Sequence, residues 1–260
     1  MTHIINLNSF PGLPYDNTHI SNTEKITIGQ ALPASLEGIL KLSEGRAFLF
    51  HVVLKNGEDI FVKPYVSRTE KEVIDKLLGL DISPVLSANA DYFVEERIRI
   101  PPIDSALAAK ATFLDYVAGL FGRALYSMHS RGISYGGRFN DNVFADDLTQ
   151  RVKVSNFSRA RLSTEPTPFY VDVIEAFTYM EALAQQNHVD DKHFLNAIKN
   201  FKSTYARDDK SVKIWDMAVY YFLYVSDSPT VVKALNKLLP PLPQAIYPKN
   251  GNSRQGFGFR

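Results

Sequence analysis

The stretch Met128–Phe144 has the sequence MHSRGISYGGRFNDNVF, and the interpretation of the whole chain depends on it. Apolar residues recur at helical spacing from Tyr116 to Met128, and this pattern stops at Arg131-Gly132, where a glycine favours the end of a helix. A polar loop and two short apolar segments follow, at residues 142–145 and 151–157. The pattern predicts a helix that leads into a loop between short strands, and such a loop can present several polar side chains from one rigid place.

The order of residues in this loop resembles the catalytic loop of the protein-kinase superfamily. In that family a phrase similar to His129-Ser130-Arg131-Gly132-Ile133 precedes a His-Arg-Asp or His-Gly-Asp triplet, and four residues and then an Asn follow the triplet. In this sequence Tyr135-Gly136-Gly137 stands in place of the triplet, and Asn142 stands at the family's spacing. Further on, Val152 to Ser158 resembles the strand that carries the family's metal-binding Asp-Phe-Gly, with Asn156-Phe157-Ser158 in its place.

The residues that carry the family's reaction are changed in this chain. Gly137 occupies the position of the acid that accepts the hydroxyl proton, and Phe139 that of a positive residue which often assists the γ-phosphate. Asn156 keeps the shape of the metal-binding acid without its charge, and Mg²⁺ prefers anionic oxygen. Loss of a general base alone costs a factor of about 10² to 10⁴ in rate. The resemblance therefore implies a pseudokinase, with no catalytic residue and no metal site.

The N-terminal half reads as a small sheet with one main helix. Asn56-Gly57 between two runs rich in β-branched and aromatic residues is a strong hairpin signal. A helix is expected over 69–80, with Thr69 as its N-cap and an apolar face that includes Val73 and Leu77. The strands expected are 39–42, 48–54, 60–63, 82–88 and 92–98.

The resemblance implies a nucleotide cleft built from residues of both halves. Gly45 is the one glycine left in the phosphate-covering loop at 42–48, and Lys63 stands where the family's lysine contacts the phosphates, with Glu72 as its expected helix partner. Asn142 and Asn156 complete this binding set. Because the loop is crowded and Asn156 is uncharged, no cofactor is expected to be required, and any ATP binding should be weak and independent of magnesium.

The C-terminal half reads as mostly helical. Helices are expected at 104–111, 112–130, 172–186, 190–201, 211–225 and 228–239, with Trp215 and the aromatic run Tyr220-Tyr221-Phe222 in the core. Asp172 looks like the family's buried aspartate, which braces the catalytic loop by accepting its backbone N–H groups. The alternative is an ordinary acid near the start of a helix.

Together these signals predict an α+β chain with a bilobed, protein-kinase-like fold. The expected parts are an irregular extension (1–22), a β-rich N-lobe (23–100), a helical C-lobe (101–243) and a flexible tail (244–260). The 260 residues are 45% hydrophobic and 12% aromatic, which supports a sizeable core. The chain contains no cysteine, which excludes disulfides and thiolate zinc sites. With no leader-like start and no long apolar run, an intracellular, soluble protein with no membrane association is expected.

Three functions remain open on this evidence. The first is a pseudokinase that acts as a non-catalytic binding or regulatory module and engages a protein partner, such as an active kinase, its substrate or its regulator. The second is an active atypical kinase of a protein or small molecule, in which Asp141 or Asp146 supplies the carboxylate. The third is a nucleic-acid-binding module, although the net charge of +1 gives no global electrostatic footprint for it. Its groove would use the basic residues Arg123, Arg131, Arg138, Arg151, Lys153, Arg159 and Arg161.

Overall fold

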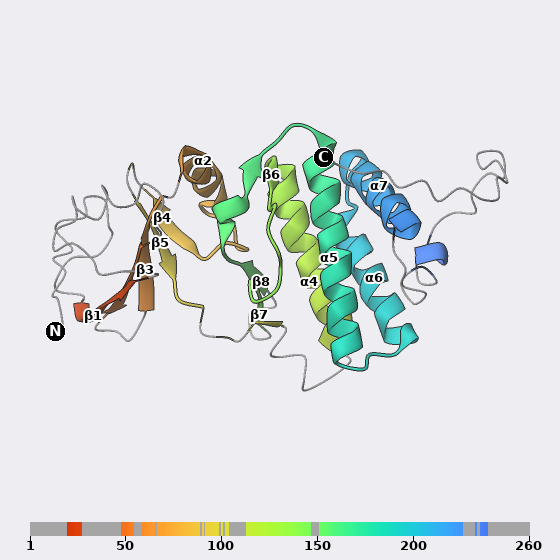
Figure 1. Cartoon of the computed structure of the whole chain (residues 1–260), viewed down its shortest axis with the longest axis horizontal. Coiled ribbons are helices and arrows are strands. Elements are labelled where there is room, and N and C mark those ends of the chain that lie inside the picture. The colour runs from red at the N-terminus through yellow and green to blue at the C-terminus, as the bar shows by residue number, and fades with distance from the viewer. Residues whose placement is uncertain are drawn as a thin grey trace.

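The computed structural model describes residues 20–27, 48–54, 59–65, 67–88, 90, 92–98, 100, 102–103, 113–146, 151–225, 232 and 235–238. Within these residues the chain is a mixed α+β protein with small antiparallel sheets. Figure 1 shows the largest sheet at one end of the molecule and the long helices at the other. The described helices include none that is both long and apolar enough to cross a membrane.

The largest sheet has five strands in the spatial order β1-β2-β3-β5-β4, and all neighbouring strands are antiparallel. Strands β2 and β3 pair antiparallel as the predicted hairpin implies, with Val53 opposite Asp59; turn residues 55–58 lie outside the described residues. The strands are β1 (Ile20–Thr27), β2 (Phe48–Leu54), β3 (Asp59–Pro64), β4 (Val85–Ala88) and β5 (Tyr92–Glu96).

Strand β1 is the main departure from the predicted strands. It begins at Ile20, inside the segment 1–22 that was expected to be irregular. Polar residues such as Asn22 and Glu24 hide the alternation of this strand, and its pairing with β2 is a tertiary contact that local composition does not reveal. The strand predicted at 39–42 lies outside the described residues.

Helix α2 (Arg68–Leu77) follows β3 and is packed by one apolar face. Val73, Ile74 and Leu77 are fully buried along that face. Its N-cap is Ser67, not the predicted Thr69, because the Ser67 hydroxyl accepts the Glu70 N–H at 3.1 Å. The helix ends just before Gly79, whose φ of +74° suits the left-handed turn after a helix.

Four long helices and two short strand pairs make up the other end of the molecule. Strand β6 (Ile133–Ser134) pairs with β9 (Arg161–Leu162), and β7 (Val143–Asp146) pairs with β8 (Arg151–Val154); the 3-10 turn η4 (Phe157–Arg159) lies between β8 and β9. The helices are α4 (Phe113–Ser130), α5 (Pro166–Gln186), α6 (Asp191–Tyr205) and α7 (Asp209–Val225). The start of α5 at Pro166 places Asp172 in its second turn, not at its start as predicted. The helix predicted at 104–111 lies outside the described residues, and so does most of that at 228–239.

The core is centred on aromatic side chains between these helices. Phe177 and Phe201 both pack against Trp215, with ring centroids 5.0 and 6.0 Å apart, and Trp215 is fully buried as predicted. Tyr220 and Tyr221 were expected in the core, but they are 38% and 49% exposed. Because Trp215 and Val219 face inward, the helical period turns these two tyrosines toward solvent.

The sheet and the helices are joined by contacts around α2 and β8. The Val154 N–H donates to the Ile82 carbonyl oxygen at 2.8 Å, which ties β8 to the segment before β4. A second link joins the end of α2 to the end of α4, since the Arg131 guanidinium donates to the Lys76 carbonyl at 2.8 Å. These contacts hold the loop that follows β6 in a fixed position relative to the sheet.

Candidate functional site

The loop 135–142 between β6 and β7 is held by one buried carboxylate. Asp172 on α5 is 1% exposed; its Oδ2 accepts the Tyr135 N–H at 2.7 Å and its Oδ1 accepts the Gly136 N–H at 2.8 Å. Gly136 has a φ of +62°, and a Cβ at this position would lie 2.7 Å from the Arg159 carbonyl oxygen, so glycine is required there. The predicted role of Asp172 as a brace of the loop is confirmed.

A buried histidine supports the same aspartate from behind. His129 Nε2 lies 3.1 Å from Asp172 Oδ2, and His129 Nδ1 lies 2.7 Å from the Tyr205 hydroxyl. Burial lowers the pKa of His129, and the hydrogen bond to Asp172 opposes that shift. A neutral imidazole fits both partners, with Nε2–H donating to Asp172 and Nδ1 accepting from Tyr205. The bond between His129 and Asp172 was not predicted from the sequence. The available signal is that His129 directly follows Met128, which is buried on the predicted helix.

The ring of Tyr135 fills the centre of the loop. It stacks on Phe139 with ring centroids 4.7 Å apart, and its hydroxyl donates to the Ser155 carbonyl at 3.0 Å. A Cβ at Gly137 would lie 3.0 Å from Tyr135 Cε1, which is tighter than ordinary side-chain contacts. Position 137 therefore carries no acidic side chain, and a side chain added there would press against the Tyr135 ring. Phe139 is buried against Phe121, so it contributes to the core and not to an open site.

The structure brings Asn142 next to the chain that carries Asn156. The Ser155 N–H donates to the Asn142 carbonyl at 3.0 Å, and the Asn142 amide nitrogen donates to the Arg138 and Asn140 carbonyls at 3.1 and 2.8 Å. Asn156 is exposed with a φ of +61°, and its Oδ1 accepts the Ser158 hydroxyl at 2.8 Å. The Asn142 amide thus holds the loop 135–142, whereas the Asn156 amide bonds to η4. Among the described residues, no group of three His, Asp or Glu side chains is placed to hold a metal ion.

Lys63 is paired with a partner other than the predicted one. It lies on β3 and forms an ion pair with Glu95 on β5, which is 4% exposed. The predicted partner, Glu72, bonds instead to Arg68 at 3.0 Å on the exposed face of α2. That prediction was wrong because α2 turns Glu70 and the apolar residues inward and Glu72 outward. The spacing of Glu70 to Val73 and Leu77 is the signal that identifies the inner face.

Strand β5 carries a second ion pair on its other face. Glu96 pairs with Lys153 of β8, and neighbouring strand residues point to opposite faces, so Glu95 and Glu96 connect β5 to two different elements. Burial lowers the pKa of Lys153, and the charge of Asp81 opposes this shift. The two lysines that approach β5 are therefore neutralised by the protein itself. Gly45, the remaining predicted binding residue, lies outside the described residues.

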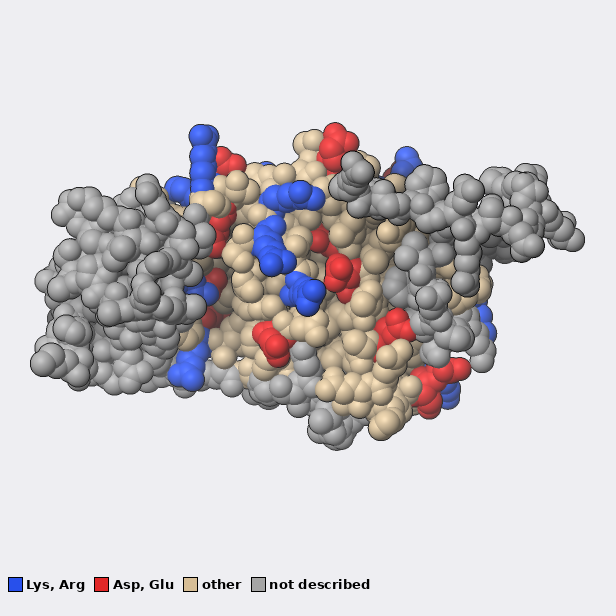
Figure 2. Space-filling view, viewed as in Figure 1, with Lys and Arg blue, Asp and Glu red and all other residues tan. Residues whose placement is uncertain are grey.

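The seven basic residues that were considered for a nucleic-acid groove do not form one surface. Arg131, Arg151 and Lys153 are bonded to Lys76, Asp81 and Glu96. The loop, η4 and β9 carry the arginines 138, 159 and 161. Figure 2 shows Lys and Arg side chains gathered over the middle of one face, where β6 lies in Figure 1. Two of the seven residues, Arg151 and Lys153, are thus paired with acids of the protein, and Arg131 is bonded to a backbone carbonyl.

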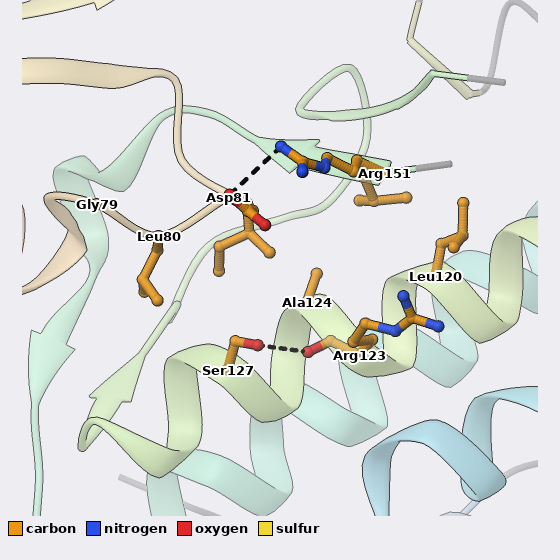
Figure 3. A pocket seen from close by; sticks show the side chains of 10 residues that line it. Gly79, Leu80, Asp81, Leu120, Arg123, Ala124, Ser127 and Arg151 are labelled. Atoms are coloured by element: carbon orange, nitrogen blue, oxygen red, sulfur yellow. Dashed lines mark hydrogen bonds and ion pairs between the residues drawn. The ribbon is translucent and has the colours of Figure 1, made fainter. Parts of the chain in front are cut away.

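A pocket of about 510 Å³ lies between residues 79–82, helix α4 and the start of β8. Figure 3 shows the Arg151–Asp81 ion pair, 3.3 Å long, beside it, and the Ser127 hydroxyl donating to the Arg123 carbonyl at 2.9 Å. Apolar side chains such as Leu80, Leu120 and Val152 form much of its remaining lining. None of the predicted site residues Lys63, Asn142 and Asn156 lines it, so it is separate from the loop.

Comparison of the sequence with protein-family models and with curated proteins gives no match. The functional conclusion therefore depends on the braced loop, its missing acid and the neutralised lysine.

Proposed function

We propose that this chain is a pseudokinase, a bilobed protein-kinase-like fold that acts as a non-catalytic binding or regulatory module. The loop sequence supports this proposal, since it keeps the family's spacing around Tyr135-Gly136-Gly137 and Asn142. The arrangement supports it as well: one end of the molecule has a sheet of five strands with helix α2, and the other end is mostly helical. The bonds from Asp172 to the loop are those that the resemblance implies.

The observation that carries the proposal is the geometry at Gly137. Phosphoryl transfer needs groups that position the reactants and neutralise developing charge, including an acid that accepts the hydroxyl proton. Here that position has no side chain, and the Tyr135 ring lies 3.0 Å from where a Cβ would be. The loop is thus braced by a buried aspartate, yet position 137 carries no acid, and a side chain there would press against the Tyr135 ring. A fold that keeps the loop but lacks the reacting acid suits a binding module. Its protein partner would be an active kinase, the substrate of that kinase or its regulator.

The ion pair of Lys63 supports weak nucleotide binding. A phosphate that approached this lysine would have to displace Glu95, a buried carboxylate whose desolvation is already compensated by the pair. Asn156 Oδ1 already accepts the Ser158 hydroxyl, and Asn142 and Asn156 are both uncharged amides, so they should hold Mg²⁺ more weakly than carboxylates would. We therefore expect that no cofactor is required, and that ATP binds weakly and without magnesium.

Thermal unfolding with ATP tests this proposal directly. With ATP present, the Tm of the wild-type protein should be the same in Mg²⁺ as in EDTA. Glu95→Gln removes the competing charge, so ATP should bind that variant about tenfold more tightly, a difference of about 1.4 kcal/mol.

Glu72→Gln is the matched control, because Glu72 pairs with Arg68 on the exposed helix face and should not affect ATP binding. A magnesium-dependent shift of the wild-type Tm would contradict the proposal.

A further inference from the structure

We propose that three arginines beside the loop, Arg138, Arg159 and Arg161, form a docking surface for a phosphorylated segment of a partner protein. We call these three residues the arginine surface. The inference rests on the proposed function, because it names the chemistry of the partner that the non-catalytic module engages.

The three side chains have charges that the protein does not neutralise. All three are exposed, and within the described part of the chain none of them makes an ion pair or a side-chain hydrogen bond. Other basic residues nearby are engaged: Arg151 with Asp81, and Lys153 with Glu96. The arginine surface therefore offers three uncompensated positive charges, on the loop, η4 and β9, to an external anion.

The backbone places the three arginines on one support. Arg161 on β9 is paired with Ser134 of β6, and the Arg159 carbonyl lies against Gly136, where it excludes a Cβ. Arg138 follows Gly136 by two residues in the same loop. Figure 2 shows Lys and Arg side chains over the middle of this face, in the region where β6 lies in Figure 1. Because Asp172 fixes the backbone of the loop, little backbone ordering is needed when an anion binds.

A phosphate group matches three guanidinium groups better than a carboxylate does. A phosphorylated side chain carries a charge of about −1.5 to −2 and three strong acceptor oxygens. Arginine presents a planar fork of N–H donors that bonds phosphate in a bidentate way. A single carboxylate has two oxygens and one charge, which one arginine can satisfy. The third guanidinium therefore favours phosphate over Asp or Glu in the bound segment.

The aromatic residues of this region argue against a nucleic acid. Proteins that bind single strands stack bases on exposed aromatic rings. Here Tyr135, Phe139 and Phe157 are 1%, 1% and 3% exposed, so they offer no stacking surface. The net charge of +1 also gives no extended basic surface for a nucleic-acid backbone. A protein segment is the partner that this combination favours.

A capture experiment with the full chain tests the proposal. The immobilised protein is offered a peptide library with a fixed central phosphoserine and random flanks, matched libraries with serine or glutamate at the centre, and a random single-stranded oligonucleotide. The test variant combines Arg138→Gln, Arg159→Gln and Arg161→Gln. The control variant combines Arg123→Gln, Lys192→Gln and Lys213→Gln, which are exposed on three helices and change the net charge equally.

The wild-type and control proteins should retain the phosphoserine library at least tenfold better than the serine and glutamate libraries, and the test variant should lose this preference. Thermal unfolding checks that the test variant is folded; if it is not, the three single substitutions are compared, each expected to weaken retention. Equal retention of all peptide libraries by the wild-type protein, undiminished retention by the folded test variant or by all three single variants, or a preference for the oligonucleotide would overturn the proposal. The ATP experiment does not involve these arginines, so failure of capture and failure of the proposed function are distinguishable.

Discussion

Both carboxylate oxygens of Asp172 accept hydrogen bonds inside the protein, and the position of the loop 135–142 depends on these bonds. Two backbone N–H groups and the His129 ring lie within 3.1 Å of these oxygens. Asp172→Asn replaces one acceptor oxygen by an NH₂ group that faces another donor. We expect the free energy of unfolding to fall by about 3 kcal/mol, because a buried network loses a partner.

Urea denaturation measures this change in the free energy of unfolding. Asp75→Asn is the control, since Asp75 pairs with Lys71 on the exposed face of α2 and should change stability by less than about 0.5 kcal/mol. Equal small effects of the two substitutions would show that Asp172 does not brace the loop.

His129 gives the protein a predicted pH dependence. Its pKa is lowered in the folded state because the ring is buried, whereas the ordinary value is 6.5. As the pH falls below about 6.5, the unfolded chain binds a proton that the folded protein resists, so the free energy of unfolding should decrease. The decrease from this residue is at most about 1.4 kcal/mol per pH unit.

Urea denaturation from pH 5 to 8 detects this slope. His129→Gln should be less stable overall but should lose this part of the slope. His188→Gln, at an exposed histidine, should keep it. The interpretation would be wrong if the slope were the same in wild type and His129→Gln.

At the residue scale, the sequence predicts which side chains matter better than it predicts which side chains they bond to. Asp172 could be named from the resemblance to the kinase family, and its bonds to the loop are as predicted, although it lies in the second turn of α5 and not at its start. The partner of Lys63 could not be named, because the choice between Glu72 and Glu95 depends on which way α2 is rotated and on the pairing of β3 with β5. Both are tertiary contacts that one strand or helix does not reveal by itself.

Helix α4 carries two glycines that face different surroundings, and this pair gives a prediction at the scale of the element. A Cβ at Gly122 would lie 2.5 Å from the Phe201 carbonyl oxygen on α6, whereas a Cβ at Gly119 has its nearest neighbour at 3.7 Å. Gly122→Ala should separate the two helices and cost about 2 kcal/mol. Gly119→Ala should be neutral or stabilise the protein by up to about 1 kcal/mol, because alanine favours a helix.

The free energies of unfolding of the two variants, measured in urea, decide between these outcomes. A similar effect of both substitutions would contradict the close packing of α4 on α6.

Most elements could be predicted where the apolar period is strong. The sequence indicates α4, α6 and α7 to within a few residues and β2 as the structure has it, whereas the strand predicted at 82–88 begins only at Val85. Polar residues weaken the signal of β1, and the N-cap was misplaced because Ser67 and Thr69 are both residues that cap helices, with serine the better of the two. The exposed Tyr220 and Tyr221 were misplaced because large aromatic residues are usually buried.

At the scale of the whole molecule, composition and patterning predict a mixed α+β chain, and the structure confirms this class. The pattern alone could not show how the loop meets the sheet. That relation depends on individual hydrogen bonds, such as those from Val154 to Ile82 and from Arg131 to Lys76. The kinase-like frame and its use as a binding module remain proposals that activity measurements can test.

Transfer of radiolabelled phosphate from ATP is the most direct test of the central claim that this frame is catalytically inactive. With Mg²⁺ present, we expect no label on the protein itself or on general protein substrates. Gly137→Asp should not restore transfer, because the Tyr135 ring occupies the space and Asn156 still lacks a charge. Labelling by the wild-type protein that Lys63→Met abolishes would contradict the account.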